Sequence, residues 1–217
     1  MPNQTDLLNI ALGMVGARRI SAIDDGSENA NQCLTFYPSI LDAALRVAHW
    51  NFATGRAILA QITDVDAPLF EYTYAWAVPS DFIKLREFYD NLNPANLVFG
   101  WEDFNYGRYR DRFRLETFIP IGAPDDTPPV KIFVSNGLNA QIVYTRRVTN
   151  PDLWDGQFFW YVAKWLASEL AKAISHDSKK AAELMQEAQA YLSMAAAADG
   201  QEQSVEPIRV NDLLWGR

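Results

Sequence analysis

The sequence predicts an α+β protein in which helices from both ends of the chain form one bundle and an antiparallel β region is inserted between them. Two observations predict this class. Apolar residues recur at helical spacing over the first fifty residues and again beyond residue 156, whereas between these stretches they recur at every second position. We therefore assign residues 1–65 and 151–198 to the helical bundle, 66–150 to a small antiparallel β domain, and 199–217 to an extended C-terminal arm.

The first two helices are predicted near the N-terminus. Thr5 is a candidate cap for the first helix, and Gly16 is expected to end it. Ser27 can cap the second helix, in which Pro38 predicts a kink or a break near Tyr37. The apolar face of this second helix consists of Ala30, Cys33, Leu34, Tyr37, Leu41, Ala44, Leu45 and Ala48.

The middle of the chain has the alternation of β-strands. Residues 70–78 place large apolar side chains at the even positions, which is typical of a half-buried strand. Further strands are expected at 83–89 and 109–119. Two short β-branched runs, 131–135 and 140–145, flank Asn136-Gly137 and predict a hairpin.

Helices return after the β region. Asn150-Pro151-Asp152 is a helix-start signature, because proline is preorganised for a first turn. The expected apolar face comprises Phe158, Val162, Trp165, Leu166, Leu170 and Ile174. A second helix is expected from Asp177 to Asp199-Gly200.

Composition narrows the classes of function. The chain has 217 residues, a net charge of −8 and one cysteine, Cys33. The negative net charge argues against non-specific binding to nucleic acid, because such binding requires many contacts between Lys or Arg and phosphate. A single cysteine excludes an intrachain disulfide and a cysteine-based zinc site. The first residues do not have the pattern of a signal peptide, and we expect no membrane span because no run of about 18 residues is apolar and uncharged.

The residues that usually carry catalysis are sparse. We expect His49 and His176 to have packing or capping roles and Cys33 to be part of the core, because no spacing brings a nucleophile, a base and an orienting acid together. Paired acids such as Asp24-Asp25 do not have the spacing of a calcium loop. Phosphate-binding glycine loops and zinc-protease motifs are absent. We therefore predict no catalytic, cofactor or metal site.

The pattern of arginines and aromatics points to an interface. In a strand, alternating arginines would share one face, which would suit a neighbouring subunit's carboxylates or a phosphate backbone, or would serve as a charged edge that discourages aggregation. Several aromatics, Trp154 and Trp160 among them, lie outside clean periodic faces. The candidate interface residues are Arg108, Arg110, Arg112, Arg114, Trp101 and Tyr106, with Leu213, Leu214 and Trp215 on the arm.

Several short motifs occur in a characteristic order. They are LGMVG (12–16), WNFA (50–53), YTY (72–74), VPSDF (78–82) and IVY (142–144), followed by a loop with Asp152 and a helix over 158–173. In this order the chain, over residues 4–198, resembles the tail tubular protein A family of short-tailed bacteriophages, the head-to-tail adaptors.

The resemblance implies a non-enzymatic virion protein of the tail and neck, assembled in the cytoplasm of the host bacterium. Such a protein forms a twelve-fold ring between the portal protein and the tail nozzle protein, which resembles tail tubular protein B, and genomic DNA passes through its channel without specific binding. The arginine stripe would then face a neighbour's acids, and the arm would reach the portal. Two alternatives stay open: a neck or head-completion connector of a longer-tailed phage, and a small ligand-binding protein or enzyme with a pocket between bundle and β domain.

Overall fold

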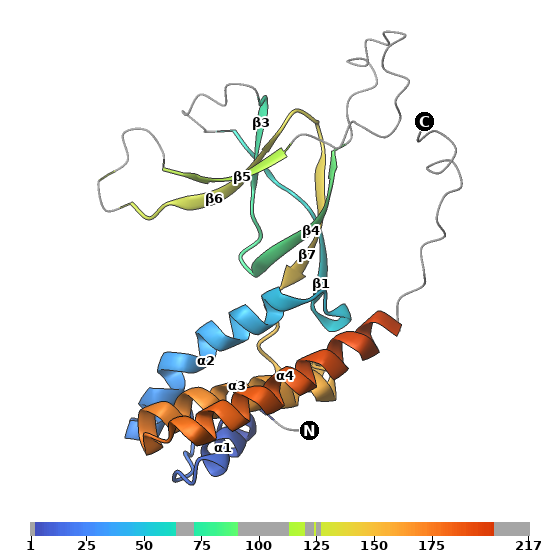
Figure 1. Cartoon of the computed structure of the whole chain (residues 1–217). Coiled ribbons are helices and arrows are strands. Elements are labelled where there is room, and N and C mark those ends of the chain that lie inside the picture. The colour runs from blue at the N-terminus through green and yellow to red at the C-terminus, as the bar shows by residue number, and fades with distance from the viewer. Residues whose placement is uncertain (1–2, 64–71, 91–112, 120–123, 125–126, 202–217) are drawn as a thin grey trace. The chain divides into compact units, whose positions relative to one another are not determined.

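The computed structural model describes residues 3–63, 72–90, 113–119, 124 and 127–201, and it has the α+β class that the sequence predicts (Figure 1). The chain divides into two compact units. The helical unit comprises Met1–Ala44, Trp50–Phe52 and Thr149–Arg217. The sheet unit comprises Leu45–His49 and Ala53–Val148. The β region is therefore an insertion between the helices, as expected.

Helix α1 spans Gln4–Met14 and begins with a reciprocal cap. The backbone N–H of Asp6 donates to Asn3 Oδ1 (2.9 Å), and the N–H of Asn3 donates to Asp6 Oδ2 (2.9 Å). This capping box satisfies backbone donors that the helix itself leaves unpaired. The cap is therefore Asn3, and the prediction of Thr5 was wrong. Gly16, with a φ of +73°, follows the end of the helix as expected.

Helix α2 spans Glu28–Val47 without the break that Pro38 predicted. Its start is confirmed, because Ala30 N–H donates to Ser27 Oγ (3.2 Å). Pro38 and Leu34, the residue four positions before it, both lie on the exposed side of the helix. Water can therefore satisfy the Leu34 carbonyl that proline leaves unpaired. Leu34 does not belong to the buried face to which the sequence analysis assigned it, whereas Cys33 does.

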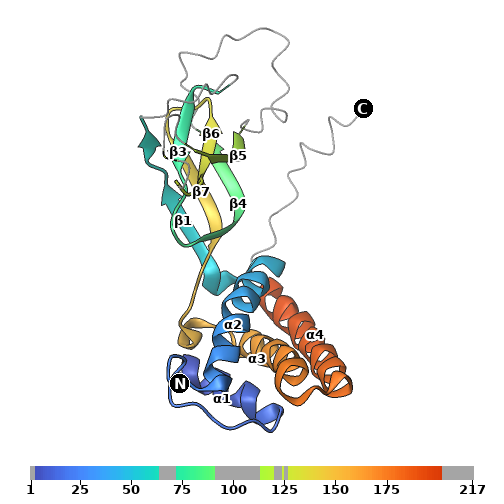
Figure 2. The same ribbon diagram turned by 90° about the vertical axis from the view of Figure 1, so that its left-hand side faces the viewer.

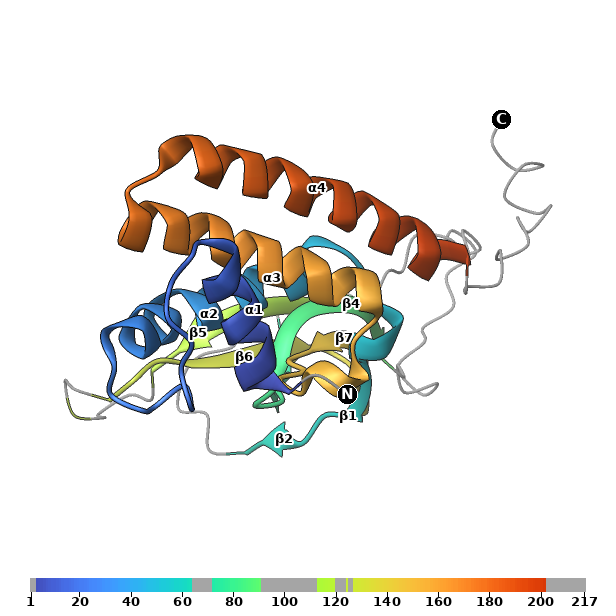
Figure 3. The ribbon, with the colours of Figure 1, turned by 90° about the horizontal axis from the view of Figure 1, so that it is seen from below.

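Helices α3 (Gly156–Leu170) and α4 (Ser178–Gln201) lie side by side in the helical unit (Figure 3). The predicted helix start at residues 150–152 is a 3₁₀ turn, Pro151–Leu153, and α3 begins after it with Asp155 as its cap. Ser168 Oγ of α3 donates to the Ala181 carbonyl of α4 (2.8 Å), so a buried hydroxyl joins the two helices. Helix α4 is described as far as Gln201, one residue beyond the predicted stop at Asp199-Gly200.

Aromatic side chains fill one end of the helical unit. Trp50 and Phe158 are fully buried, with ring centroids 4.9 Å apart in an edge-to-face arrangement. Trp50 Nε1 donates to the Ala44 carbonyl (3.0 Å), which satisfies the one polar atom of this ring. Trp154 packs edge-on against Phe158 at 5.1 Å and is buried. Trp154 is therefore a core residue, although its position outside a periodic face suggested an interface.

The sheet unit contains two antiparallel sheets (Figure 1 and Figure 2). One has the strand order β1–β7–β4, formed by Thr54–Ile58, Ala140–Arg146 and Phe82–Asp90. The other has the order β2–β3–β6–β5, formed by Gln61–Ile62, Tyr74–Ala77, Val130–Ser135 and Phe113–Phe118. Strands β1 and β2 lie within residues 1–65, so the assignment of that whole stretch to the helical bundle was wrong.

The Asn136-Gly137 corner does not form the predicted hairpin. Strand β6 pairs with β3 on one side and β5 on the other, and β7 pairs with β1 and β4. Both hydrogen-bonding edges of β6 are therefore occupied, and β7 must enter the other sheet. The two sheets share a core to which β6 contributes Phe133 and β7 contributes Ile142 and Tyr144.

The alternating pattern of residues 70–78 predicts a strand that is buried on one face, whereas β3 is buried on both faces. Trp76 belongs to the shared core, and its Nε1 donates to the buried Ser135 Oγ (3.0 Å). Its neighbour Ala75 points to the opposite side and packs with Ile132 and Val134. The strand is therefore not half-buried as predicted.

Candidate interaction surface

The structure describes one of the nine predicted interface residues, Arg114. The others lie outside the described residues; they are Trp101, Tyr106, Arg108, Arg110, Arg112, Leu213, Leu214 and Trp215. Arg114 is exposed on β5, an edge strand of its sheet, and its guanidinium carbon lies 5.9 Å from the ring centroid of Tyr72. Glu116 follows on the same face, so the described end of the predicted stripe carries one base and one acid.

A second surface, exposed in part, lies on the three-stranded sheet β1–β7–β4, on the side away from the shared core. Strand register identifies its members, because side chains alternate between the faces and paired residues share one. We call this side the outer face. It consists of Thr54, Arg56 and Ile58 on β1, Gln141, Val143 and Thr145 on β7, and Lys84, Glu87 and Tyr89 on β4.

One end of the outer face is basic. Arg86 lies at a register shift between Leu85 and Glu87, so its side chain can reach across the sheet. Its Nε donates to Thr145 Oγ1 (3.0 Å) and its Nη1 donates to Thr54 Oγ1 (2.8 Å). One guanidinium therefore links all three strands.

The charged groups around His49 also indicate a positive potential at this end of the outer face. Burial lowers the pKa of His49, and the nearby charges of Arg86 and Lys84 lower it further, against the smaller opposing effect of Glu87. Lys84 Nζ is itself held by the Arg46 carbonyl (3.3 Å). The imidazole is therefore neutral at pH 7 and adds no charge to this end of the sheet.

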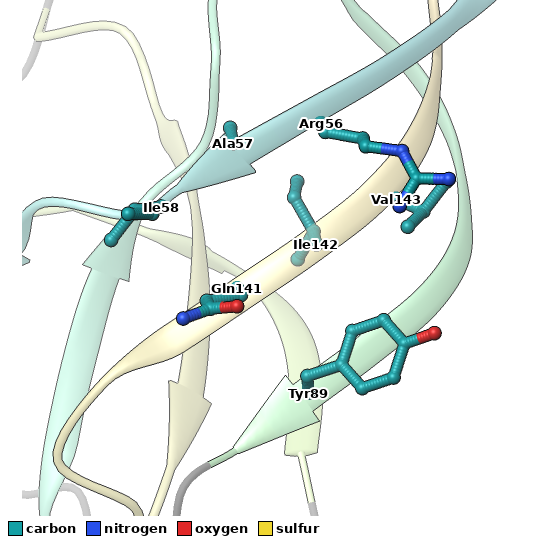
Figure 4. A pocket seen from close by; sticks show the side chains of 7 residues that line it. All are labelled: Arg56, Ala57, Ile58, Tyr89, Gln141, Ile142 and Val143. Atoms are coloured by element: carbon teal, nitrogen blue, oxygen red, sulfur yellow. The ribbon is translucent and has the colours of Figure 1, made fainter.

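The other end of the outer face is apolar and hollowed. A depression with about 180 Å³ of free space is lined by Arg56, Ala57, Ile58, Tyr89, Gln141, Ile142 and Val143 (Figure 4). Arg56 from β1 and Tyr89 from β4 lie on either side of the β7 residues. Ile58 is 77% exposed and Tyr89 is 50% exposed, and the Tyr89 hydroxyl donates to the Glu87 carboxylate. The space is enough for one side chain or a small ring.

The sequence analysis missed this surface because it placed β1 in the helical bundle. A signal was present: Thr54, Arg56 and Ile58 alternate with Gly55 and Ala57, as in a strand whose inner side chains must be small. Gly55 faces Tyr144 on β7, where an added Cβ would lie 2.8 Å from two carbons of the ring. The pattern is short, and it follows directly on a helix without a break.

Cys33 is a free, fully buried thiol whose pKa is raised to about 11 by burial, which confirms its expected place in the core. Within the described residues, His, Cys, Asp and Glu side chains do not gather in groups of three or more that could hold a metal ion. His49 and His176 are both exposed, and His176, with a φ of 52°, has the expected capping role, because its N–H donates to the Ala171 carbonyl at the end of the π-helical turn Ala171–Ser175.

Charge is distributed unevenly between the units. The described residues of the sheet unit include eight Lys or Arg and four Asp or Glu, whereas those of the helical unit include six and twelve. The segments of the sheet unit outside the description add three arginines and eight acids in sequence. The strands thus carry the positive charge, and the helical unit carries much of the negative charge.

No described helix has the length and apolarity needed to cross a membrane. The chain matches no protein-family model, and no curated protein matches its sequence.

Proposed function

We propose that this chain is a structural adaptor of a bacteriophage virion, which forms a ring of identical copies between the portal protein and the tail nozzle protein around the DNA channel. The observation that carries the proposal is the architecture. Most of the sheet unit, Ala53–Val148, is inserted between Phe52 and Thr149 of a helical unit built from both ends of the chain. That arrangement is the one implied by the resemblance to the tail tubular protein A family.

The surface of the sheet unit supports a role in assembly. The depression on the outer face has about 180 Å³ of free space, whereas clefts that bind small molecules usually have about 300–1,000 Å³. Around it, arginine, tyrosine and isoleucine are exposed together, and the first two are enriched at protein interfaces. These features favour a protein partner over a small ligand.

The charge distribution supports association between copies. A closed ring requires each subunit to present two different surfaces that fit each other. The described residues of the sheet unit are net positive and those of the helical unit are net negative, although the sheet unit as a whole, with its other segments, is close to neutral. Such an arrangement favours head-to-tail contact over contact between like surfaces.

The proposal is tested by native mass spectrometry and negative-stain imaging of the chain with the portal protein and the nozzle protein from the same genome. We expect a ring of about twelve copies that forms on the portal and then binds the nozzle protein. A chain that stays monomeric in the presence of the portal would overturn the proposal. A ring that forms on the portal but binds a terminator of a longer tail instead of a nozzle would identify the connector alternative.

A further inference from the structure

We propose that the depression on the outer face is a socket for a second copy of this chain, and that its occupant is the acidic turn Asp152–Asp155 with Leu153 at its tip. The proposal rests on the proposed function in one respect, because a ring of identical subunits needs two complementary surfaces. It goes further by naming both surfaces.

The socket combines an apolar floor with one basic lining residue, Arg56, while the exposed Glu87 carboxylate beside it accepts from the Tyr89 hydroxyl. Val143 forms the floor and is nearly buried, whereas Ile58 and Tyr89 stand exposed beside it. Arg56 is exposed on β1 at the edge of the depression. A matching partner therefore presents one apolar side chain next to a carboxylate.

Leu153 meets this description. Among the exposed large apolar side chains of the described residues, two have a carboxylate close on each side in sequence: Leu153, with Asp152 and Asp155, and Tyr89, which is itself part of the socket. Leu153 is 55% exposed, and both of its neighbouring acids are exposed. The free space in the socket is enough for one such side chain.

The turn that carries Leu153 is preorganised. Asp152 N–H donates to Asn150 Oδ1 (3.1 Å), and Gln157 N–H donates to Asp155 Oδ1 (2.7 Å). Between these two caps, the side chain of Trp154 is buried in the helical unit and holds the turn in place. A rigid knob and a rigid socket lose little conformational freedom on binding, so a small contact can be specific.

A phosphate backbone fits the outer face less well. Arg86 and Lys84 direct donors to groups of their own chain, which leaves Arg56 as the exposed base beside the depression. Exposed Ile58 gains nothing from contact with phosphate. The helical unit that carries Leu153 also has twice as many acids as bases among its described residues. These observations favour a second copy.

Disulfide trapping between two tagged chains of different mass tests the contact. One chain carries Ile58→Cys and the other Leu153→Cys, and native Cys33 is buried in both. The matched control replaces Leu153→Cys with Met194→Cys, because Met194 is 57% exposed on the same helical unit. We expect the mixed disulfide to form on the order of ten times faster with Leu153→Cys than with Met194→Cys, since a specific contact raises the effective concentration of the two thiols. Equal rates would overturn the proposal.

A charge exchange gives an independent test. We expect Arg56→Glu and Asp152→Arg each to slow the trapping on the order of tenfold, and chains that carry both substitutions to recover, because the exchanged charges attract again. Lys131→Glu makes the same charge change on an exposed residue of β6 and serves as the control. Failure of the double variant to recover would refute the assigned charge pair. A loss of duplex DNA retention in Arg56→Glu, with trapping at the control rate, would assign the face to phosphate instead.

The outcome is separable from that of the proposed function. If the chain assembles on the portal but the Ile58–Leu153 pair traps no faster than the control, the ring uses other surfaces and this inference is wrong. If the pair traps in the free chain but no portal-dependent ring forms, the contact stands and the adaptor proposal is wrong.

Discussion

Gly55→Ala probes the closest approach between two strands of the sheet unit. Gly55 on β1 is the register partner of Tyr144 on β7, and both face the shared core. A Cβ at Gly55 would lie 2.8 Å from Cε1 and from Cζ of the Tyr144 ring and 3.2 Å from Cε2. These distances are well inside normal carbon–carbon contact, so either the ring or the strand must move.

The ring has little freedom to move. Tyr144 Oη donates to Asp81 Oδ1 (2.9 Å), and the ring stacks on Phe82 with centroids 5.8 Å apart. Overpacking of a tight core costs about 1–3 kcal/mol. Loss of the hydrogen bond would add about 1 kcal/mol, whereas alanine regains about 0.5–1 kcal/mol over glycine in a strand. We therefore expect Gly55→Ala to lower the free energy of unfolding by about 2 kcal/mol and the Tm by about 4–8 °C.

A double-mutant cycle in urea isolates the clash from other effects. In a chain with Tyr144→Ala the ring is absent, so Gly55→Ala should be neutral or slightly stabilising there. The two substitutions should therefore be coupled by more than about 1 kcal/mol. A Gly55→Ala variant as stable as the native chain, or an equal cost with and without Tyr144, would refute the reasoning.

Three further predictions follow from buried or perturbed groups. Cys33, whose pKa is raised to about 11, should resist a thiol reagent at pH 8 in the native chain and react at once in urea; rapid native labelling would contradict its buried position. The pKa of His49 is lowered in the folded state, which disfavours its protonated form, so the free energy of unfolding should fall as the pH drops below about 6.5. Because the charge of Lys84 contributes to this lowering, the NMR titration midpoint of His49 should rise in Lys84→Met, and an unchanged midpoint would show that Lys84 does not affect this pKa. Ser168→Ala removes the hydrogen bond to the Ala181 carbonyl and should lower the free energy of unfolding, measured in urea, by about 1 kcal/mol. An equal loss from Ser193→Ala, at an exposed serine, would show that the buried hydrogen bond stabilises the chain no more than an exposed one.

Local chemistry made the helices predictable. Ser27 caps the start of α2, and Gly16 follows the end of α1. Each acts within one turn of its helix, so the sequence alone identifies both boundaries. Pro38 does not break α2, because the effect of a proline depends on which side of the helix it occupies, and exposure is a tertiary property. The Asn3 cap was missed because Thr5, another common capping residue, stands two positions later.

The sheets were harder to predict because pairing is not local. Asn136-Gly137 has the chemistry of a hairpin turn, yet β6 already has a partner on each edge, and one of them, β3, lies almost sixty residues earlier. The outer face was hidden for the same reason. Arg56, Lys84 and Val143 come from three strands spread over almost ninety residues, and only the register places them together.

Each unit has its own core, and this bears on how the chain responds to a destabilising substitution. Phe133 and Tyr144 belong to the core of the sheet unit, whereas Cys33 is buried in the helical unit. If the units unfold separately, Gly55→Ala should expose sheet amides to hydrogen exchange and leave the labelling rate of Cys33 unchanged. If both respond equally, the chain unfolds as one cooperative unit despite its two cores. The first result would mean that the chain can lose its sheet contacts while its helical unit stays folded, so assembly defects and folding defects could be told apart in one variant.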